Sequence, residues 1–164
     1  MSDDHIYRLL KLLTHVLGRL PVWAADFCSN LLGLLWFRID KRHRAVTLEN
    51  LTHCFGNEMG PEQIEIMGKQ VFKNIAAIIF EVAWGQKFSK QAFLSHFTIK
   101  GREHIQAAHA KGKGVLALTC HMGNFEMLTS AIHETGLKGY VIYRSLDFKP
   151  LDRLIQKIRR RFEL

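Results

Sequence analysis

A histidine and a glutamate, His121 and Glu126, stand five positions apart directly after a short apolar run. Inside a helix that spacing separates two side chains by about 140° around the axis, so they can meet only if the helix begins between them. Gly123 and Asn124 suit such a beginning, because both tolerate the dihedral angles of a tight turn. An imidazole beside the first amides of a helix could remove a proton from a hydroxyl during acyl transfer. The alternative is a buried polar pair at a strand–helix junction.

Arg144 closes the next apolar run and is a second candidate for chemistry. A guanidinium at this position could bind an oxyanion or a substrate phosphate, or it could form a structural ion pair. Cys120 precedes the histidine, but neighbouring side chains at a strand end point in opposite directions, which disfavours a Cys–His nucleophile. The three cysteines form no Cys-x-x-Cys pair and the nine histidines show no metal-ligand spacing, so we expect reduced thiols, no metal and no cofactor.

Short apolar runs alternate with helical patterns from Phe97 onward. We expect strands at 97–100, 115–119 and 140–143, and helices at 103–111, at 125–135 and from 151 onward. This order predicts an α/β fold, with βαβ units forming a mostly parallel sheet. Ligands bind such sheets at the carboxyl ends of the strands, where His121 and Arg144 both fall. Upstream, Pro61 and two early glutamates predict the start of a long helix with an apolar stripe.

The first forty residues are the most hydrophobic part of the chain. Pro21 divides an apolar stretch here, and the second half, 22–39, is slightly short for a membrane span, whereas 12–37 is long enough if the chain bends at Pro21. Tryptophans near the ends of that half and basic residues after it favour membrane association, although a pair of buried core helices is the alternative. We therefore divide the chain into a hydrophobic membrane anchor, 1–40, and a second domain, 41–164.

The net charge of +8 indicates an anionic partner. Nucleic acid, anionic lipid, a phosphorylated substrate and an acidic carrier protein all fit this charge. The basic run Arg159-Arg-Arg161 is not accompanied by a nucleic-acid-reading motif, so we expect no nucleic-acid partner. A basic nucleic-acid module would also leave the His–Glu arrangement unexplained.

The chain resembles the lipid A biosynthesis acyltransferase family, the late lauroyl and myristoyl transferases of Gram-negative bacteria, within the lysophospholipid acyltransferase-like superfamily. The resemblance rests on residues 44–56, 97–104, 111–126, 140–144 and 150–155. Its most specific part is His121-Met-Gly-Asn-Phe-Glu126, which matches the family's motif of a histidine followed by an acid five positions later. Arg144 matches the second motif. Family members are typically almost twice this length, so we expect a truncated, N-terminal portion of such an enzyme.

The resemblance implies a glycerolipid-acyltransferase-like α/β fold with N-terminal membrane-associated helices, at the bacterial inner membrane and facing the cytoplasm. It implies acyl transfer from an acyl carrier protein thioester to a hydroxyl of a phosphorylated glycolipid, a lipid A precursor or a relative of it. His121 would be the general base and Glu126 its orienting partner, while Gly123, Asn124 and Arg144 would bind substrate. The alternative is a non-catalytic truncated, membrane-bound remnant, or a subunit that binds lipid or carrier protein.

Overall fold

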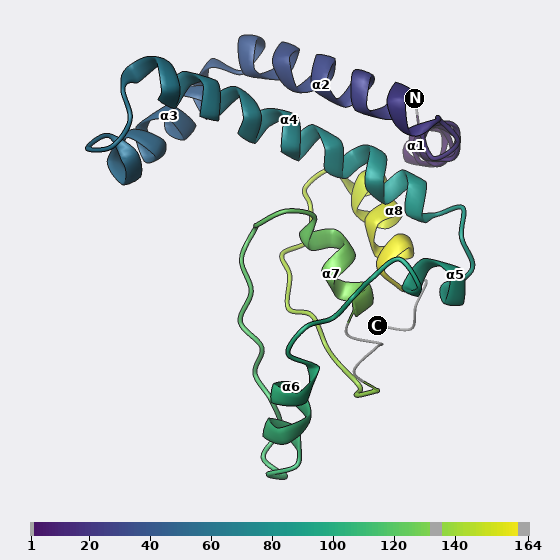
Figure 1. Cartoon of the computed structure of the whole chain (residues 1–164). Coiled ribbons are helices and arrows are strands. Elements are labelled where there is room, and N and C mark those ends of the chain that lie inside the picture. The colour runs from purple at the N-terminus through teal and green to yellow at the C-terminus, as the bar shows by residue number, and fades with distance from the viewer. Residues whose placement is uncertain (1, 132–135, 161–164) are drawn as a thin grey trace. The chain divides into compact units, whose positions relative to one another are not determined.

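The computed structural model describes residues 2–131 and 136–160, with no side-chain description for 129–131. Helices dominate this part of the chain (Figure 1). In order they are α1 (Asp3–Leu17), α2 (Val22–Ile39), α3 (Lys41–Phe55), α4 (Pro61–Gly85), α5 (Lys90–Leu94), α6 (Arg102–His109), α7 (Phe125–Ala131) and α8 (Lys149–Arg159). The chain divides into two compact units, Arg19–Glu81 and a second unit made of Met1–Gly18 and Val82–Leu164.

The unit Arg19–Glu81 is built on α2, α3 and most of α4. Phe37 of α2 and Phe72 of α4 are buried and meet edge to face, with ring centroids 5.3 Å apart. Gly33 allows this close approach, because a Cβ there would lie 2.5 Å from the Cα of Lys73. Figure 1 shows α2 and α4 running alongside each other. The core of this unit is therefore a helix–helix contact made by aromatic side chains.

Local signals at the helix ends explain where these helices begin. Asp40 caps α3, because its carboxylate accepts a hydrogen bond from the His43 amide at 3.1 Å. That bond is the main reason why the pKa of the Asp40 carboxyl lies below its ordinary value, with a hydrogen bond from the Trp36 indole adding to it. The helix expected to begin at Pro61 is confirmed as α4, and the Gln63 side chain accepts a hydrogen bond from the Gly60 amide.

The second unit contains α1, the end of α4, and α5 to α8. Helices α1 and α8 pack together, and Arg153 of α8 pairs with Asp4 of α1 at 2.7 Å. Phe93 of α5 and Leu154 of α8 are buried in this unit. The helix expected after residue 151 is confirmed as α8, whereas the one expected at 125–135 is described only to Ala131 and its last four residues lie outside the described part.

The expected α/β fold, with βαβ units in a mostly parallel sheet, is wrong for the described residues, which contain no strand. The segments 97–100, 115–119 and 140–143 lack regular secondary structure and form no strand ladder. In 115–119 and 140–143 several apolar side chains lie in the open, with exposed fractions of 84% for Leu116, 90% for Leu118 and 96% for Ile142. An apolar run indicates a preference for extended backbone, but a parallel strand also needs paired neighbours and cover on both faces.

The hydrophobic N-terminal region folds as two helices that are separated by residues 18–21. Within the described ranges no helix combines the length and apolar character that a membrane crossing requires. We expected a boundary at residue 40 between a membrane anchor, 1–40, and a second domain, 41–164. This boundary depends on membrane attachment and stays a prediction.

Candidate active site

His121 lies in an exposed turn between the irregular segment 114–120 and α7. Its imidazole packs against the Phe125 ring, with the centroids 4.4 Å apart and the planes at 64°. Gly123 makes the turn possible, because its φ of +58° falls in the left-handed region that favours glycine. The predicted beginning of a helix between His121 and Glu126 is confirmed, since α7 begins at Phe125. An exposed imidazole in this position can accept a proton from a hydroxyl that reaches it.

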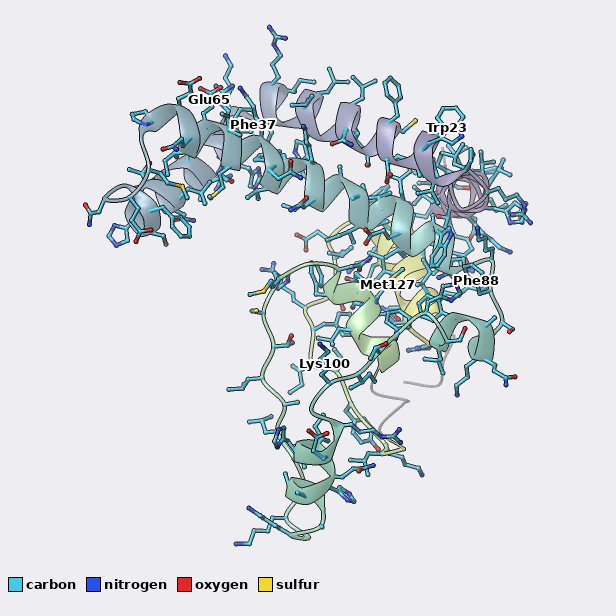
Figure 2. The ribbon with its side chains drawn as sticks, viewed as in Figure 1. Trp23, Phe37, Glu65, Phe88, Lys100 and Met127 are labelled. Atoms are coloured by element: carbon cyan, nitrogen blue, oxygen red, sulfur yellow. The ribbon has the colours of Figure 1, made fainter. Side chains whose placement is uncertain are left out.

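Asn124 fixes the first turn of α7. Its side-chain oxygen accepts a hydrogen bond from the Met127 amide at 3.2 Å, which is the usual role of asparagine before a helix. Met127 then packs at the C-terminal end of α4, where a Cβ on Gly85 would lie 3.4 Å from the Met127 methyl carbon (Figure 2). A capped first turn and an anchored Met127 together set the direction in which the neighbouring Glu126 leaves the helix.

Glu126 is held by Arg159 of α8 in a bidentate ion pair. The Arg159 Nε and Nη2 atoms donate to the two carboxylate oxygens at 2.9 and 2.6 Å. The side chains are 20% exposed for Arg159 and 18% for Glu126, so water screens this pair far less than a surface pair. Two parallel charge-assisted hydrogen bonds restrict both the position and the plane of the carboxylate.

Arg144 is exposed. The residue before it, Tyr143, lies against Arg159 of α8. The guanidinium carbon of Arg159 lies 4.8 Å from the centroid of the Tyr143 ring, a favourable cation–π distance. Arg159 therefore contacts both α7 and the segment that leads to Arg144.

Asp152 is a carboxylate with an exposed fraction of only 7%. It accepts a hydrogen bond from the Leu146 amide at 2.9 Å and another from the Gln156 side chain at 2.7 Å. Leu146 stands two residues after Arg144, so Asp152 fixes the loop that follows this arginine. A buried charge is expensive unless it is paired and hydrogen-bonded, which these two donors achieve in part.

The structure thus assigns Glu126 a partner, Arg159, that the sequence analysis had treated only as part of a basic run. It also adds Asp152, which the sequence analysis did not single out. One signal was available: Asp152 and Arg159 stand seven residues apart, two helical turns, and therefore on the same face of α8. Cys120 is exposed, and the described residues contain no cluster of three side chains suited to a metal ion.

A family model of bacterial lipid A biosynthesis acyltransferases matches residues 6–164, which is nearly the whole chain and includes both candidate motifs. No curated protein and no solved structure matches the chain.

Proposed function

This chain belongs to the bacterial lipid A biosynthesis acyltransferase family, and from that premise we propose that it moves a fatty acyl chain from an acyl carrier protein thioester to a hydroxyl of a lipid A precursor or related glycolipid. The observation that carries this proposal is the fixed carboxylate of Glu126, which follows an exposed imidazole in the motif that the family shares. O-acylation needs a general base, which the exposed imidazole of His121 can supply. In the structure His121 packs against Phe125, and both carboxylate oxygens of Glu126 bind Arg159.

In the proposed reaction His121 is the general base. Its neutral imidazole takes the proton of the acceptor hydroxyl while the hydroxyl oxygen forms a bond to the thioester carbonyl carbon. The tetrahedral oxyanion then collapses, the carbon–sulfur bond breaks, and the imidazolium returns its proton to the departing thiolate. Glu126 orients the imidazole and stabilises its protonated form, the role that a carboxylate has beside a catalytic histidine. The acyl group passes directly to the acceptor, without a covalent enzyme intermediate.

The proposed substrate contacts lie in the same unit of the chain. Arg144 binds a phosphate or the oxyanion, and its exposure leaves the guanidinium accessible to a ligand. Gly123 and Asn124 shape the turn beside His121, so that the acceptor hydroxyl can come close to the imidazole. The net charge of +8 supports an acidic carrier protein as donor and a phosphorylated glycolipid as acceptor, since both are anionic.

Membrane attachment is part of the proposal, at the cytoplasmic face of the bacterial inner membrane. Helix α1 carries an exposed apolar stripe at the i, i+3, i+4 and i+7 positions, formed by Leu9, Leu12, Leu13 and Val16. The contacts of α1 with α8 involve Asp4 and Tyr7, which lie on the other side of the helix. In the other unit, Trp23 of α2 (Figure 2) is also largely exposed, as is Phe27 of the same helix. Such faces suit the interfacial region of a bilayer, next to anionic headgroups.

Vesicle sedimentation tests the attachment. Leu12→Ser combined with Leu13→Ser should lower binding to neutral phospholipid vesicles by about tenfold or more, because each leucine contributes about 1 kcal/mol or more of apolar burial. Lys11→Ser, a change outside the stripe on the same helix, should bind as the unaltered chain does. Equal binding by all three proteins would show that the α1 stripe does not touch lipid.

The reaction itself is tested by mass spectrometry of the acceptor. The full chain is incubated with acyl carrier protein bearing a fatty acyl thioester and with a lipid A precursor in detergent micelles. The proposal expects a product heavier by one acyl group, and loss of that product with His121→Ala. Binding of carrier protein or glycolipid with no acyl transfer would instead support the non-catalytic alternative, a subunit that binds lipid or carrier.

A further inference from the structure

One face of α8 holds the two segments that carry the candidate site. Arg159 binds the Glu126 carboxylate of α7, and Asp152 binds the Leu146 amide in the loop after Arg144. Seven residues make almost two full turns, so the two α8 side chains project from one face of the helix. A single helix, α8, therefore contacts both the start of α7 and the loop after Arg144.

The Arg159 guanidinium is fixed on more than one side. Its donors meet both oxygens of Glu126, and its central carbon lies 4.8 Å from the centroid of the Tyr143 ring. Lysine could supply the charge but not two parallel hydrogen bonds from one planar group. The site thus uses the geometric properties of arginine as well as its charge.

Asp152 has no part in the chemistry proposed above, and it is nevertheless a buried carboxylate. Its two oxygens accept from the Leu146 amide and from the Gln156 side chain. The bond from Leu146 joins α8 to irregular backbone that has no strand ladder to hold it in place. Asp152 thus accepts the hydrogen bond of the Leu146 amide, which in a sheet would go to a neighbouring strand.

We propose that α8 is the positioning helix of the acyltransferase site, with Arg159 holding Glu126 in its working orientation and Asp152 holding the loop that follows Arg144. The inference rests on the proposed function for its kinetic consequences. Arg159 is a positioning residue in this proposal: it acts through Glu126 and does not touch the substrate. Its small exposed fraction, 20%, agrees with that role, whereas its neighbour Arg160 is exposed.

Steady-state kinetics of the full chain test the role of Arg159. Arg159→Gln should lower kcat about tenfold to a hundredfold and change KM for donor and acceptor less than about twofold, since small displacements of a reacting group have effects of this size. Arg159→Lys should recover part of the loss because the charge remains. Arg160→Gln, the matched control on the next residue, should keep the kcat of the unaltered chain.

A double variant separates action through Glu126 from independent action. If Arg159 works through this carboxylate, Arg159→Gln combined with Glu126→Gln should have nearly the same kcat as Glu126→Gln alone. A double variant whose loss of kcat equals the product of the two single losses would overturn the proposal. An unchanged kcat for Arg159→Gln would also overturn it, as would a raised KM for the phosphorylated acceptor with kcat intact, which would make Arg159 a substrate-binding residue.

Hydrogen–deuterium exchange gives a second measurement that does not depend on turnover. Arg159→Gln should speed amide exchange in residues 121–131, and Asp152→Asn, which keeps one acceptor oxygen and is the mildest change at that position, should speed it in residues 143–147. Arg160→Gln should alter neither segment. If the unaltered chain shows no acyl transfer, the proposed function fails and the exchange pattern alone decides the positioning role. Unchanged exchange in the Arg159 and Asp152 variants would refute that role.

Discussion

The Glu126–Arg159 pair should stabilise the fold measurably more than another arginine–carboxylate pair, Arg153–Asp4, at the surface of the same helix. Arg153 of α8 pairs with Asp4 at 2.7 Å, and the corresponding Arg159–Glu126 distance is 2.6 Å. Both guanidiniums also lie over a tyrosine ring. The main differences are bidentate geometry and burial: the Arg153 and Asp4 side chains are 61% and 73% exposed, against 20% and 18% for Arg159 and Glu126.

The expected magnitudes follow from that difference. Hydrogen bonds to charged groups away from water contribute about 1.5–3 kcal/mol, and we expect a coupling free energy in this range for Glu126 and Arg159. Exposed ion pairs contribute about 0.2–1 kcal/mol, and we expect Asp4 and Arg153 to fall there. Added salt should weaken the exposed pair more, because the surrounding water screens its charges.

Two double-mutant cycles measure these couplings by urea denaturation. One uses Glu126→Gln, Arg159→Gln and their combination, and the other uses Asp4→Asn, Arg153→Gln and theirs. Each cycle isolates the pairwise contribution from other effects of the substitutions. Equal couplings in the two cycles, or a stronger coupling for the exposed pair, would refute the claim that burial and bidentate geometry make the Glu126 contact special.

Three further predictions concern the unit Arg19–Glu81. Gly33→Ala should lower the free energy of unfolding by about 1–3 kcal/mol in urea denaturation, because the new Cβ would meet the backbone of Lys73; an unchanged value would mean that α2 and α4 do not approach so closely. Phe72→Ala should cost about 3–5 kcal/mol in the same assay through loss of buried ring contacts, and a cost below 1 kcal/mol would place this ring outside the core. Because the pKa of Asp40 is lowered on folding, its contribution to stability is present above the ordinary value of 3.8 and is lost as pH falls below it. Circular dichroism during acid titration should therefore show a smaller acid-side loss for Asp40→Ala than for the unaltered chain, and identical titrations would contradict the capping role.

Helices were predicted well from the sequence, because their signals are local. Pro61 and the glutamate that follows it mark the start of α4, as expected, and Gly56 is the residue that caps the end of α3. The turn between His121 and Glu126 was also predictable, since Gly123 and Asn124 each favour it through their own backbone and side-chain properties. Signals of this kind need no information about distant parts of the chain.

The sheet was wrongly predicted because strand pairing is not a local property. Leu116, Leu118 and Ile142 have the residue types of buried strands, yet the structure leaves them exposed without a paired neighbour. The same limit applies to the partner of Glu126, which stands 33 residues away on α8. The seven-residue spacing from Asp152 places Arg159 on the same face of α8, but only the fold shows that this face meets Glu126.

The central claim is that His121 is the base of an acyl transfer, and a single comparison of rates tests it most directly. The rate of acyl transfer from carrier protein to lipid A precursor is measured at saturating substrates for the unaltered chain, His121→Ala and His104→Ala. His104 is an exposed histidine on α6, and its removal controls for loss of an imidazole elsewhere. We predict a loss of about a hundredfold or more for His121→Ala and an unchanged rate for His104→Ala. A His121→Ala protein that folds and transfers acyl chains at the unaltered rate would contradict the account.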